Sequence, residues 1–186
     1  MIYLYHLVLM KVSLPKEYRF IKFINGGFHG NIYLVMKGNQ YRVLKEIVDL
    51  QGGINELVFL NKIKHKHIIK LLDYFVYDNK LYFEFYYHGN GSLLNRVNNG
   101  FISNYEVSKW KNQINEVVKY CHMNNFYHND LKLNNILIDK NHNIILIDFG
   151  CSKFININSY EKNNIDNINL AKIIKILEEN KLFSKI

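Results

Sequence analysis

The first half of the chain alternates short apolar runs with polar turns, a pattern typical of β-strands. Runs at 18–24, 32–36 and 41–48 are separated by a glycine-rich turn and by a polar turn at 37–40. Two further runs at 68–77 and 80–87 meet at Asp78-Asn79, a pair that favours a tight turn. The pattern predicts an antiparallel meander of three strands and, later, a two-stranded addition.

Elsewhere apolar residues recur at helical spacing. We expect Gly52-Gly53 to break the chain, and a helix over 54–65 to follow with the apolar residues Ile54, Leu57, Val58, Leu60 and Ile63. A longer helix is predicted over 104–125, with an apolar face made of Val107, Trp110, Ile114, Val117, Val118 and Cys121. A short hairpin over 135–148 and a last helix over 165–180 complete the prediction.

These elements predict an α+β fold in two lobes. A small lobe over 18–87 holds the antiparallel sheet and one helix, and a mainly helical lobe covers 88–186, with residues 1–17 as an extension. The 186 residues, 48% hydrophobic with a single proline, suffice for one folded domain and exclude a Pro-rich linker. The apolar decapeptide at the start is too short to cross a bilayer, so we expect no membrane association.

Charge and cysteine content restrict the partners only weakly. The net charge of +8 suits nucleotides or phosphates, but it is equally typical of a lysine-rich solvated surface. No dense basic run with interleaved aromatic residues occurs, so nucleic acid is not favoured as a partner. The two cysteines form no CxxC pair, which favours a reducing intracellular location, most simply the cytoplasm. His65, His67 and Cys121-His122 match no zinc spacing.

Three separate stretches carry candidate chemistry. Gly26, Gly27 and Gly30 lie in a turn between strands, where backbone amides can approach phosphate oxygens. Asp148 follows an apolar strand and precedes a glycine, a suitable place for an oxygen ligand to Mg²⁺. Residues 128–135 read His-Asn-Asp-Leu-Lys-Leu-Asn-Asn. With 27 asparagines in the chain, a single Asn carries little weight, and the stretch could by itself be a surface turn.

Taken in order along the chain, these stretches resemble the protein kinase superfamily. The octapeptide at 128–135 stands where that family has HRDLKPEN, and Asp-Phe-Gly is intact at 148–150. Lys45 resembles the lysine of the third strand, and Glu56 its partner on the following helix. Asp166, Leu170 and Ala171 resemble the start of the helix that anchors the catalytic loop. The resemblance implies a two-lobed kinase-like fold whose large lobe is reduced.

The resemblance also implies a set of site residues. Asp130 would accept or orient the proton of the substrate hydroxyl, and Lys132 would stabilise the transferring phosphoryl group. Asn135 and Asp148 would hold Mg²⁺. ATP would contact a larger set, made of these two residues and of Asn25, Gly26, Gly27, Gly30, Ile32, Lys45, Glu56, Phe85, Tyr86 and His88. Lys132, two places after the Asp, is the serine/threonine-type pattern, so the expected substrate is a protein hydroxyl.

Several positions depart from the family. Asn25 replaces the first glycine of the loop, and Asn129 replaces the arginine that answers a phosphorylated activation segment. Only about sixteen residues separate Gly150 from Asp166, and no APE motif occurs. Together these changes predict activity that needs no phosphorylation of that segment. Glu56 is expected near the start of its helix, which weakens the predicted ion pair with Lys45.

The last helix carries isoleucines around much of its circumference, as a buried helix does. The helices that usually complete the large lobe of the family and would cover this surface are missing from the predicted elements. We therefore expect part of the surface of the last helix to be exposed and to offer a contact for a protein partner. Three functions stay open at this point: an ATP- and Mg²⁺-dependent serine/threonine-type kinase, a kinase-like binding module without turnover, and a small-molecule or RNA-associated kinase.

Overall fold

The computed structural model describes residues 13–27, 30–100, 102–154 and 165–182. Of residues 181 and 182 it describes the backbone only. The described residues divide into two compact units. The first unit consists of the residues up to Asp49 together with Leu71–Tyr87, and the second of Leu50–Lys70 together with the residues from His88 onward. The predicted extension at 1–17 lies outside the described residues except for its last five positions.

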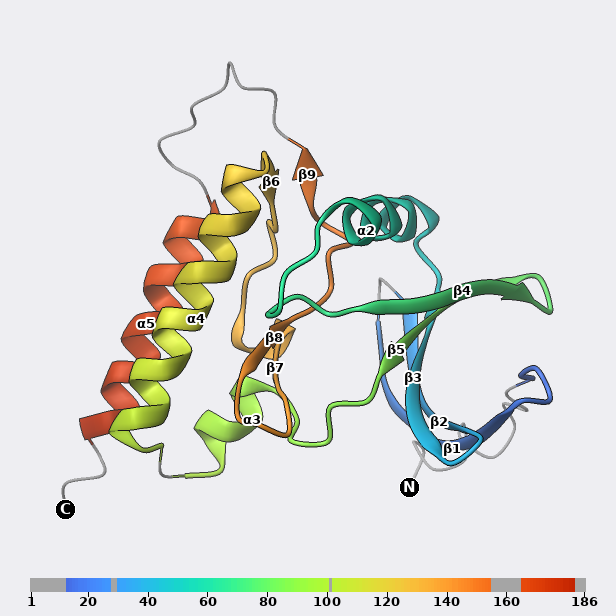
Figure 1. Cartoon of the computed structure of the whole chain (residues 1–186), viewed down its shortest axis with the longest axis horizontal. Coiled ribbons are helices and arrows are strands. Elements are labelled where there is room, and N and C mark those ends of the chain that lie inside the picture. The colour runs from blue at the N-terminus through green and yellow to red at the C-terminus, as the bar shows by residue number, and fades with distance from the viewer. Residues whose placement is uncertain (1–12, 28–29, 101, 155–164, 183–186) are drawn as a thin grey trace. The chain divides into compact units, whose positions relative to one another are not determined.

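The first unit is one antiparallel sheet (Figure 1). Its five strands are β1 (Tyr18–Gly27), β2 (Gly30–Lys37), β3 (Gln40–Ile47), β4 (Leu71–Tyr77) and β5 (Lys80–Tyr86). Their order in the sheet is β1-β2-β3-β5-β4. The turn between β4 and β5 places Asp78 and Asn79 at φ of 51° and 58°, a conformation that these two residue types tolerate well. The predicted meander and the α+β fold class are confirmed.

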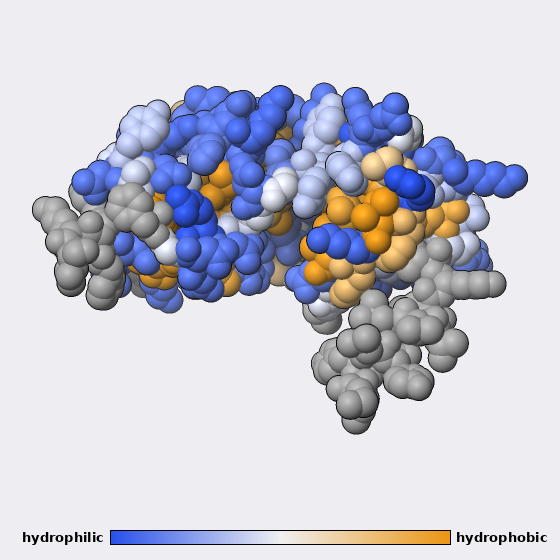
Figure 2. Space-filling model, turned by 90° about the horizontal axis from the view of Figure 1, so that it is seen from below, coloured by the Kyte–Doolittle hydropathy of each residue, from blue (hydrophilic) through white to orange (hydrophobic). Residues whose placement is uncertain are grey.

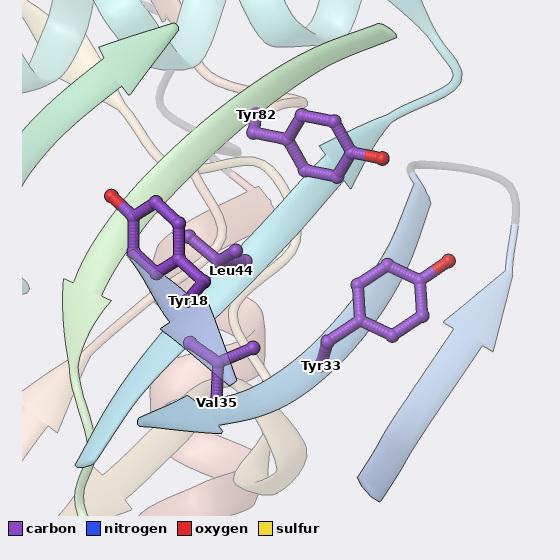
Figure 3. Packing of buried hydrophobic residues seen from close by; sticks show 5 residues of the cluster. All are labelled: Tyr18, Tyr33, Val35, Leu44 and Tyr82. Atoms are coloured by element: carbon purple, nitrogen blue, oxygen red, sulfur yellow. The ribbon is translucent and has the colours of Figure 1, made fainter. Parts of the chain in front are cut away.

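One face of this sheet carries a packed cluster of apolar and aromatic side chains. Figure 3 shows five of its members, which come from four different strands: Tyr18, Tyr33, Val35, Leu44 and Tyr82. The phenol oxygens find carboxylate acceptors, since Tyr18 donates to Glu84 at 2.6 Å and Tyr33 to Glu46 at 2.7 Å. Burial, reinforced by the bond to Glu84, raises the pKa of Tyr18 to about 12. Since side chains alternate along a strand, Lys45 lies on the opposite face from Leu44.

The edge strand β1 exposes apolar side chains. Phe20, Ile21, Phe23 and Ile24 are each at least one third exposed. Figure 2 shows apolar side chains gathered on the surface over the sheet. Phe20 and Phe23 make edge-to-face contacts with Tyr33, with ring centroids 6.2 Å and 6.0 Å apart. This side of the unit is therefore aromatic on its surface as well as in its interior.

Gly30 begins β2 at φ +140°, where a Cβ atom would stand 1.9 Å from the backbone oxygen of Glu46. A side chain at this position must therefore push β2 and β3 apart. We expect Gly30→Ala to lower the free energy of unfolding by about 1–3 kcal/mol, as measured by urea denaturation. Gly38→Ala is the matched control, because Gly38 also has positive φ but has open space around it. An equal loss in both variants would show that backbone conformation, not crowding, decides.

The second unit combines helices with short strands. Its helices are α2 (Leu50–Lys62), α3 (Leu93–Asn98), α4 (Asn104–Met123) and α5 (Ile165–Leu182), with the 3₁₀ turn η1 (Leu133–Asn135). Its strand pairs are β6 (Phe126–Tyr127) with β9 (Lys153–Phe154), and β7 (Ile136–Ile138) with β8 (Ile144–Leu146). Helices α4 and α5 lie side by side and antiparallel (Figure 1), so that His122 contacts Asp166 while Lys111 contacts Glu178.

Helix α4 follows the prediction closely. All six residues of its predicted apolar face are buried. Its start is fixed by a capping box in which Ser103 accepts from the backbone N–H of Glu106, and Glu106 accepts from that of Ser103. The short helix α3 is absent from the prediction, although Ser92 and Asn95 form a capping box of the same kind.

Helix α2 corrects two expectations. It begins at Leu50, before Gly52 and Gly53, and both glycines are buried inside it. Glu56 therefore lies in the middle of the helix and not near its start. The buried face runs through Gly52, Gly53, Glu56, Phe59 and Leu60, so Ile54 and Val58 are exposed instead. The helix therefore accommodates both glycines on its buried face, although glycine has a low helix propensity.

In the described residues of α5, Ile173 and Leu177 are buried, whereas Ile165 and Ile168 are each 44% exposed. The expectation of partly exposed apolar surface on this helix thus holds at its first turn. None of the helices in the described residues has the length and apolar character needed to cross a membrane.

Candidate active site

The hairpin of β7 and β8, in the second unit, brings the backbones of the two predicted metal ligands, Asn135 and Asp148, close together. Ile136 pairs with Leu146, and the N–H of Ile147 donates to the backbone oxygen of Asn135 at 2.9 Å. Asn135 therefore lies beside the strand end from which Asp148 follows. The hairpin pattern of apolar residues that predicted this pairing also explains why two residues thirteen positions apart share one end of it.

Asp130 is the centre of a small polar network. Its Oδ2 accepts from Lys132 Nζ at 2.7 Å and from Asn135 Nδ2 at 2.9 Å. Asn135 Nδ2 also donates to the backbone oxygen of Asp130 at 2.9 Å, which fixes the loop on which the carboxylate is carried. Asn135 is buried, whereas the Lys132 side chain is half exposed. The predicted catalytic pair and one predicted metal ligand are thus in direct contact.

Asp166, at the start of α5, anchors the loop at 128–135. Its carboxylate is 1% exposed and accepts from the backbone N–H of His128 at 2.7 Å and of Asn129 at 2.8 Å. His122 Nε2 lies 3.2 Å from the same group. Burial alone would raise the pKa of Asp166, but the hydrogen bonds from His122 and the two backbone N–H groups outweigh burial and lower it. An ionised, buried carboxylate therefore anchors the residues directly before Asp130.

His128 is buried and its tautomer follows from its contacts. Its Nδ1 accepts from the N–H of Asp130 at 3.2 Å, so Nε2 carries the proton and donates to the oxygen of Ile147 at 2.9 Å. Burial lowers the pKa of His128, against the opposing effects of Ile147 and of nearby carboxylates, Asp166 first. A neutral imidazole thus ties the loop to the strand end before Asp148.

We expect the protein to lose stability in mild acid because of His128. The folded chain keeps this imidazole neutral, whereas the unfolded chain takes up a proton below about pH 6.5. The contribution of His128 to the free energy of unfolding is therefore fully present above that pH. Below it the free energy of unfolding falls by up to about 1.4 kcal/mol per pH unit for one such histidine. His67 and His88, whose pKa values burial also lowers, act in the same direction. The depressed pKa of Asp166 adds a second loss below about pH 4.

Urea unfolding at pH 7.5 and 5.5 measures this effect. His128→Gln should show a smaller difference between the two pH values than the unchanged protein. His142→Gln serves as the control, because the side chain of His142 is 60% exposed and should leave the difference unchanged. Identical pH dependence in the His128 variant would show that this histidine is not the source.

Asp148 has a backbone φ of +63°, a left-handed conformation that Asp adopts more easily than most residues. The next residue is fully buried, since Phe149 stacks on Phe59 of α2 with ring centroids 3.9 Å apart and planes inclined by 12°. His128 lies against the same ring at 4.8 Å. The left-handed backbone at Asp148 is thus held in place by an aromatic contact on its C-terminal side.

In the first unit, the predicted nucleotide residues occupy neighbouring strands. Gly27 pairs with Gly30, and Asn25 with Ile32. Ile32 also pairs with Lys45 of β3, which in turn pairs with Phe83 of β5. Directly paired residues share a face of the sheet, so Ile32 and Lys45 lie on the face opposite the aromatic cluster. Lys45 is 6% exposed.

The remaining predicted residues are divided between the units. Phe85 is buried in β5, and Tyr86 is exposed beneath the Arg42 guanidinium, 5.0 Å from its ring. Glu56, buried in α2, and His88 belong to the second unit. The ion pair of Lys45 with Glu56, which belong to different units, stays a prediction. The contact of the nucleotide with the predicted residues of either unit also stays a prediction.

Asn135 and Asp148 carry oxygen donors of the chemical type that a magnesium ion takes. Because Nδ2 of Asn135 faces Asp130, its carbonyl Oδ1 lies on the other side of the amide and is turned away from Asp130. An amide oxygen and the carboxylate of Asp148 are hard oxygen ligands of the type that Mg²⁺ takes, usually together with water and substrate phosphates. The donor set that Asn135 and Asp148 provide is therefore suitable for this ion.

Several residues that shape the site have no role assigned from the sequence. His128 enters the prediction only as part of the octapeptide at 128–135, and His122 only as a residue that matches no zinc spacing, although both make contacts that hold the loop. Asn55 of α2 donates to the oxygen of Gly150 at 3.4 Å, and no sequence signal distinguished it among so many asparagines. The anchoring role of Asp166 was predictable, because the resemblance to the protein kinase superfamily implies it. The composition around Asp166 does not indicate it.

The chain matches known proteins over most of its length. The protein kinase domain matches residues 22–169. CBL-interacting serine/threonine-protein kinase 12 of Arabidopsis thaliana is 30% identical over 164 residues, which cover 76% of this chain and 33% of that protein. A probable serine/threonine-protein kinase KIN1 homolog of Enterocytozoon bieneusi is 39% identical over 115 residues, 61% of this chain and 19% of that protein.

Carbon catabolite-derepressing protein kinase of Candida glabrata is 29% identical over 165 residues, which cover 83% of this chain and 27% of that protein. The chain thus spans a third or less of the length of these relatives. The match of the kinase domain includes the glycine-rich turn, Lys45, the loop around Asp130 and Asp148. On this evidence, the chain belongs to the protein kinase family.

Proposed function

We propose that the chain is an ATP- and Mg²⁺-dependent kinase of the serine/threonine type that phosphorylates a protein hydroxyl. The observation that carries the proposal is the network around Asp130, in which Lys132 and Asn135 both contact the same carboxylate oxygen. A carboxylate so placed can orient a hydroxyl and accept its proton. The relatives with serine/threonine kinase names support the same substrate class.

Each residue would act through position and charge, since phosphoryl transfer needs little covalent chemistry from the protein. Asp130 would orient the hydroxyl, and Lys132 would neutralise charge on the transferring group. Lys45 would bind the α- and β-phosphates. Asn135 and Asp148 would hold Mg²⁺, which when bound supplies charge neutralisation on the phosphate oxygens.

Transfer of labelled phosphate tests the proposal. The purified chain is incubated with γ-labelled ATP, Mg²⁺ and a generic protein substrate, and incorporation into substrate and into the chain itself is counted. Incorporation should depend on Mg²⁺ and vanish in Asp130→Ala. If Asp130→Ala incorporates as much label as the unchanged chain, the label comes from a contaminating kinase and the proposal fails.

A kinase-like binding module without turnover is the second candidate. It is favoured by the exposed apolar side chains Ile165 and Ile168 at the start of α5, which offer a contact for a protein partner. Such a module should form a stable complex that survives Asp148→Ala and is lost in the double variant Ile165→Glu, Ile168→Glu. A clean monomer that turns over ATP would count against it.

A further inference from the structure

The backbone that follows Asp148 is held by side chains from two directions. Asn129 Nδ2 donates to the oxygen of Cys151 at 3.2 Å. Asn55 Nδ2 donates to the preceding carbonyl oxygen, that of Gly150, at 3.4 Å. The two amides come from the catalytic loop and from α2, respectively, and both belong to the second unit. Two consecutive carbonyls thus accept hydrogen bonds from neutral side chains.

The neighbouring carbonyls are occupied as well. Ile147 O accepts from His128 Nε2 at 2.9 Å, and Phe149 O accepts from the N–H of Ser152 at 3.0 Å. Four carbonyls between 147 and 151 therefore have donors, and three of these donors are side chains. Asp148, with its left-handed φ of +63°, lies inside this held segment.

Both asparagines make a further hydrogen bond. The N–H of Asn129 donates to the buried carboxylate of Asp166 at 2.8 Å, and its φ of 60° is one that Asn adopts more easily than most residues. The Oδ1 of Asn55 accepts from Gln51 Nε2 at 3.1 Å, which orients the amide so that Nδ2 is available for Gly150. Amides held in this way lose little side-chain entropy when they donate.

We propose that Asn129 and Asn55 are positioning residues. Their amides clamp the carbonyls of Cys151 and Gly150 and thereby fix the backbone that aims the Asp148 carboxylate. This clamp, made of the Asn129 and Asn55 amides, uses only neutral donors. It therefore needs neither a charged side chain at position 129 nor a phosphorylated residue that would pair with such a charge. Its kinetic consequence rests on the proposed kinase activity, whereas the clamp itself can be measured without nucleotide.

The chain offers two readouts that do not need turnover. The first is hydrogen exchange of the backbone amides at 147–152, with the hairpin at 136–146 as internal reference. The second is the labelling rate of the Cys151 thiol, which is partly exposed. Cys121 serves as its reference, because burial raises the pKa of this thiol to about 12 and keeps it unreactive.

The informative variants remove an amide while sparing the backbone. Asn129→Gly accepts a positive φ without strain, and Asn129→Asp keeps the side-chain shape but cannot donate. Asn55→Leu removes the second amide on α2. Asn134→Ala and Asn61→Ala are matched controls, since these asparagines are exposed and lie in the same loop and on the same helix.

In both Asn129 variants we expect exchange at 147–152 and labelling of Cys151 to become roughly fivefold faster, the effect of one lost hydrogen bond. Asn55→Leu should have a smaller effect, because its bond is longer, and the double variant a larger one than either. The hairpin, Cys121 and both control variants should not change. Unchanged rates in the two Asn129 variants would overturn the proposal, and so would an equal increase in the hairpin, which would indicate general loosening.

Turnover supplies the functional part of the test. In an active preparation the Mg²⁺ concentration for half-maximal rate should rise several-fold in Asn129→Gly, more than kcat falls, because the clamp acts on a predicted metal ligand. A fall in kcat alone, with an unchanged Mg²⁺ requirement, would overturn the positioning role. Absence of turnover in the unchanged chain would defeat the proposed function, while the exchange and labelling results would still decide on the clamp.

Discussion

Asp130→Asn should lower the rate of phosphate transfer by roughly 10²–10⁴-fold, the usual contribution of a positioned acid–base group. The amide keeps the shape of the carboxylate but cannot take the hydroxyl proton. It also places a neutral group opposite Lys132 Nζ, which now lies 2.7 Å from an anionic oxygen. Initial rates at saturating ATP and Mg²⁺ measure the effect.

The same substitution should leave the fold intact. The carboxylate of Asp130 is partly exposed, and an exposed ion pair contributes little to stability. The unfolding midpoint of Asp130→Asn should therefore lie close to that of the unchanged chain. Asn134→Ala is the control for the loop, since Asn134 is exposed one position before Asn135. Full activity in Asp130→Asn would remove this carboxylate from the chemistry.

The fold was predictable where the apolar positions of an element define a single buried face. The six residues on the buried face of α4 follow from helical spacing alone. The hairpins β1–β2, β2–β3 and β4–β5 follow from apolar runs separated by turn residues, whereas the pairing of β3 with β5 joins strands that are not consecutive and does not follow from these runs. In α2 the pattern had two solutions, because apolar residues cover more than one face. Burial of Gly52 and Gly53 selected the face that exposes Ile54 and Val58, and no local rule predicts that choice.

The site was predictable only as a set of motifs. The resemblance assigned roles to Asp130, Asn135 and Asp148, but their contacts depend on the β7–β8 hairpin and on Asp166, which is distant in the sequence. The hydrogen bonds of Asn129 and Asn55 to the backbone after Asp148 involve carbonyl groups that every residue has. Sequence patterns carry no information on such bonds.

Asp166→Ala should destabilise the protein by about 3–5 kcal/mol, the range for removing one partner from a buried charged network. The N–H groups of His128 and Asn129 lose a buried acceptor, and an unsatisfied buried donor costs about 1–3 kcal/mol each. This loss is a large fraction of the 5–15 kcal/mol that stabilises a typical domain. Urea unfolding at pH 7.5 measures it.

Asp139→Ala is the matched control. The Asp139 carboxylate also accepts from two backbone N–H groups, those of Asn141 and Asn143, both at 2.8 Å. These donors lie in the hairpin turn, where water can replace the carboxylate, so the loss should stay near 1 kcal/mol. Equal losses in the two variants would mean that burial of Asp166 is unimportant. Because Asp166 anchors the loop that carries Asp130, its removal should lower stability and turnover together, whereas Asp130→Asn lowers turnover alone. This contrast separates the residue that would act on the substrate from the one that holds it in place.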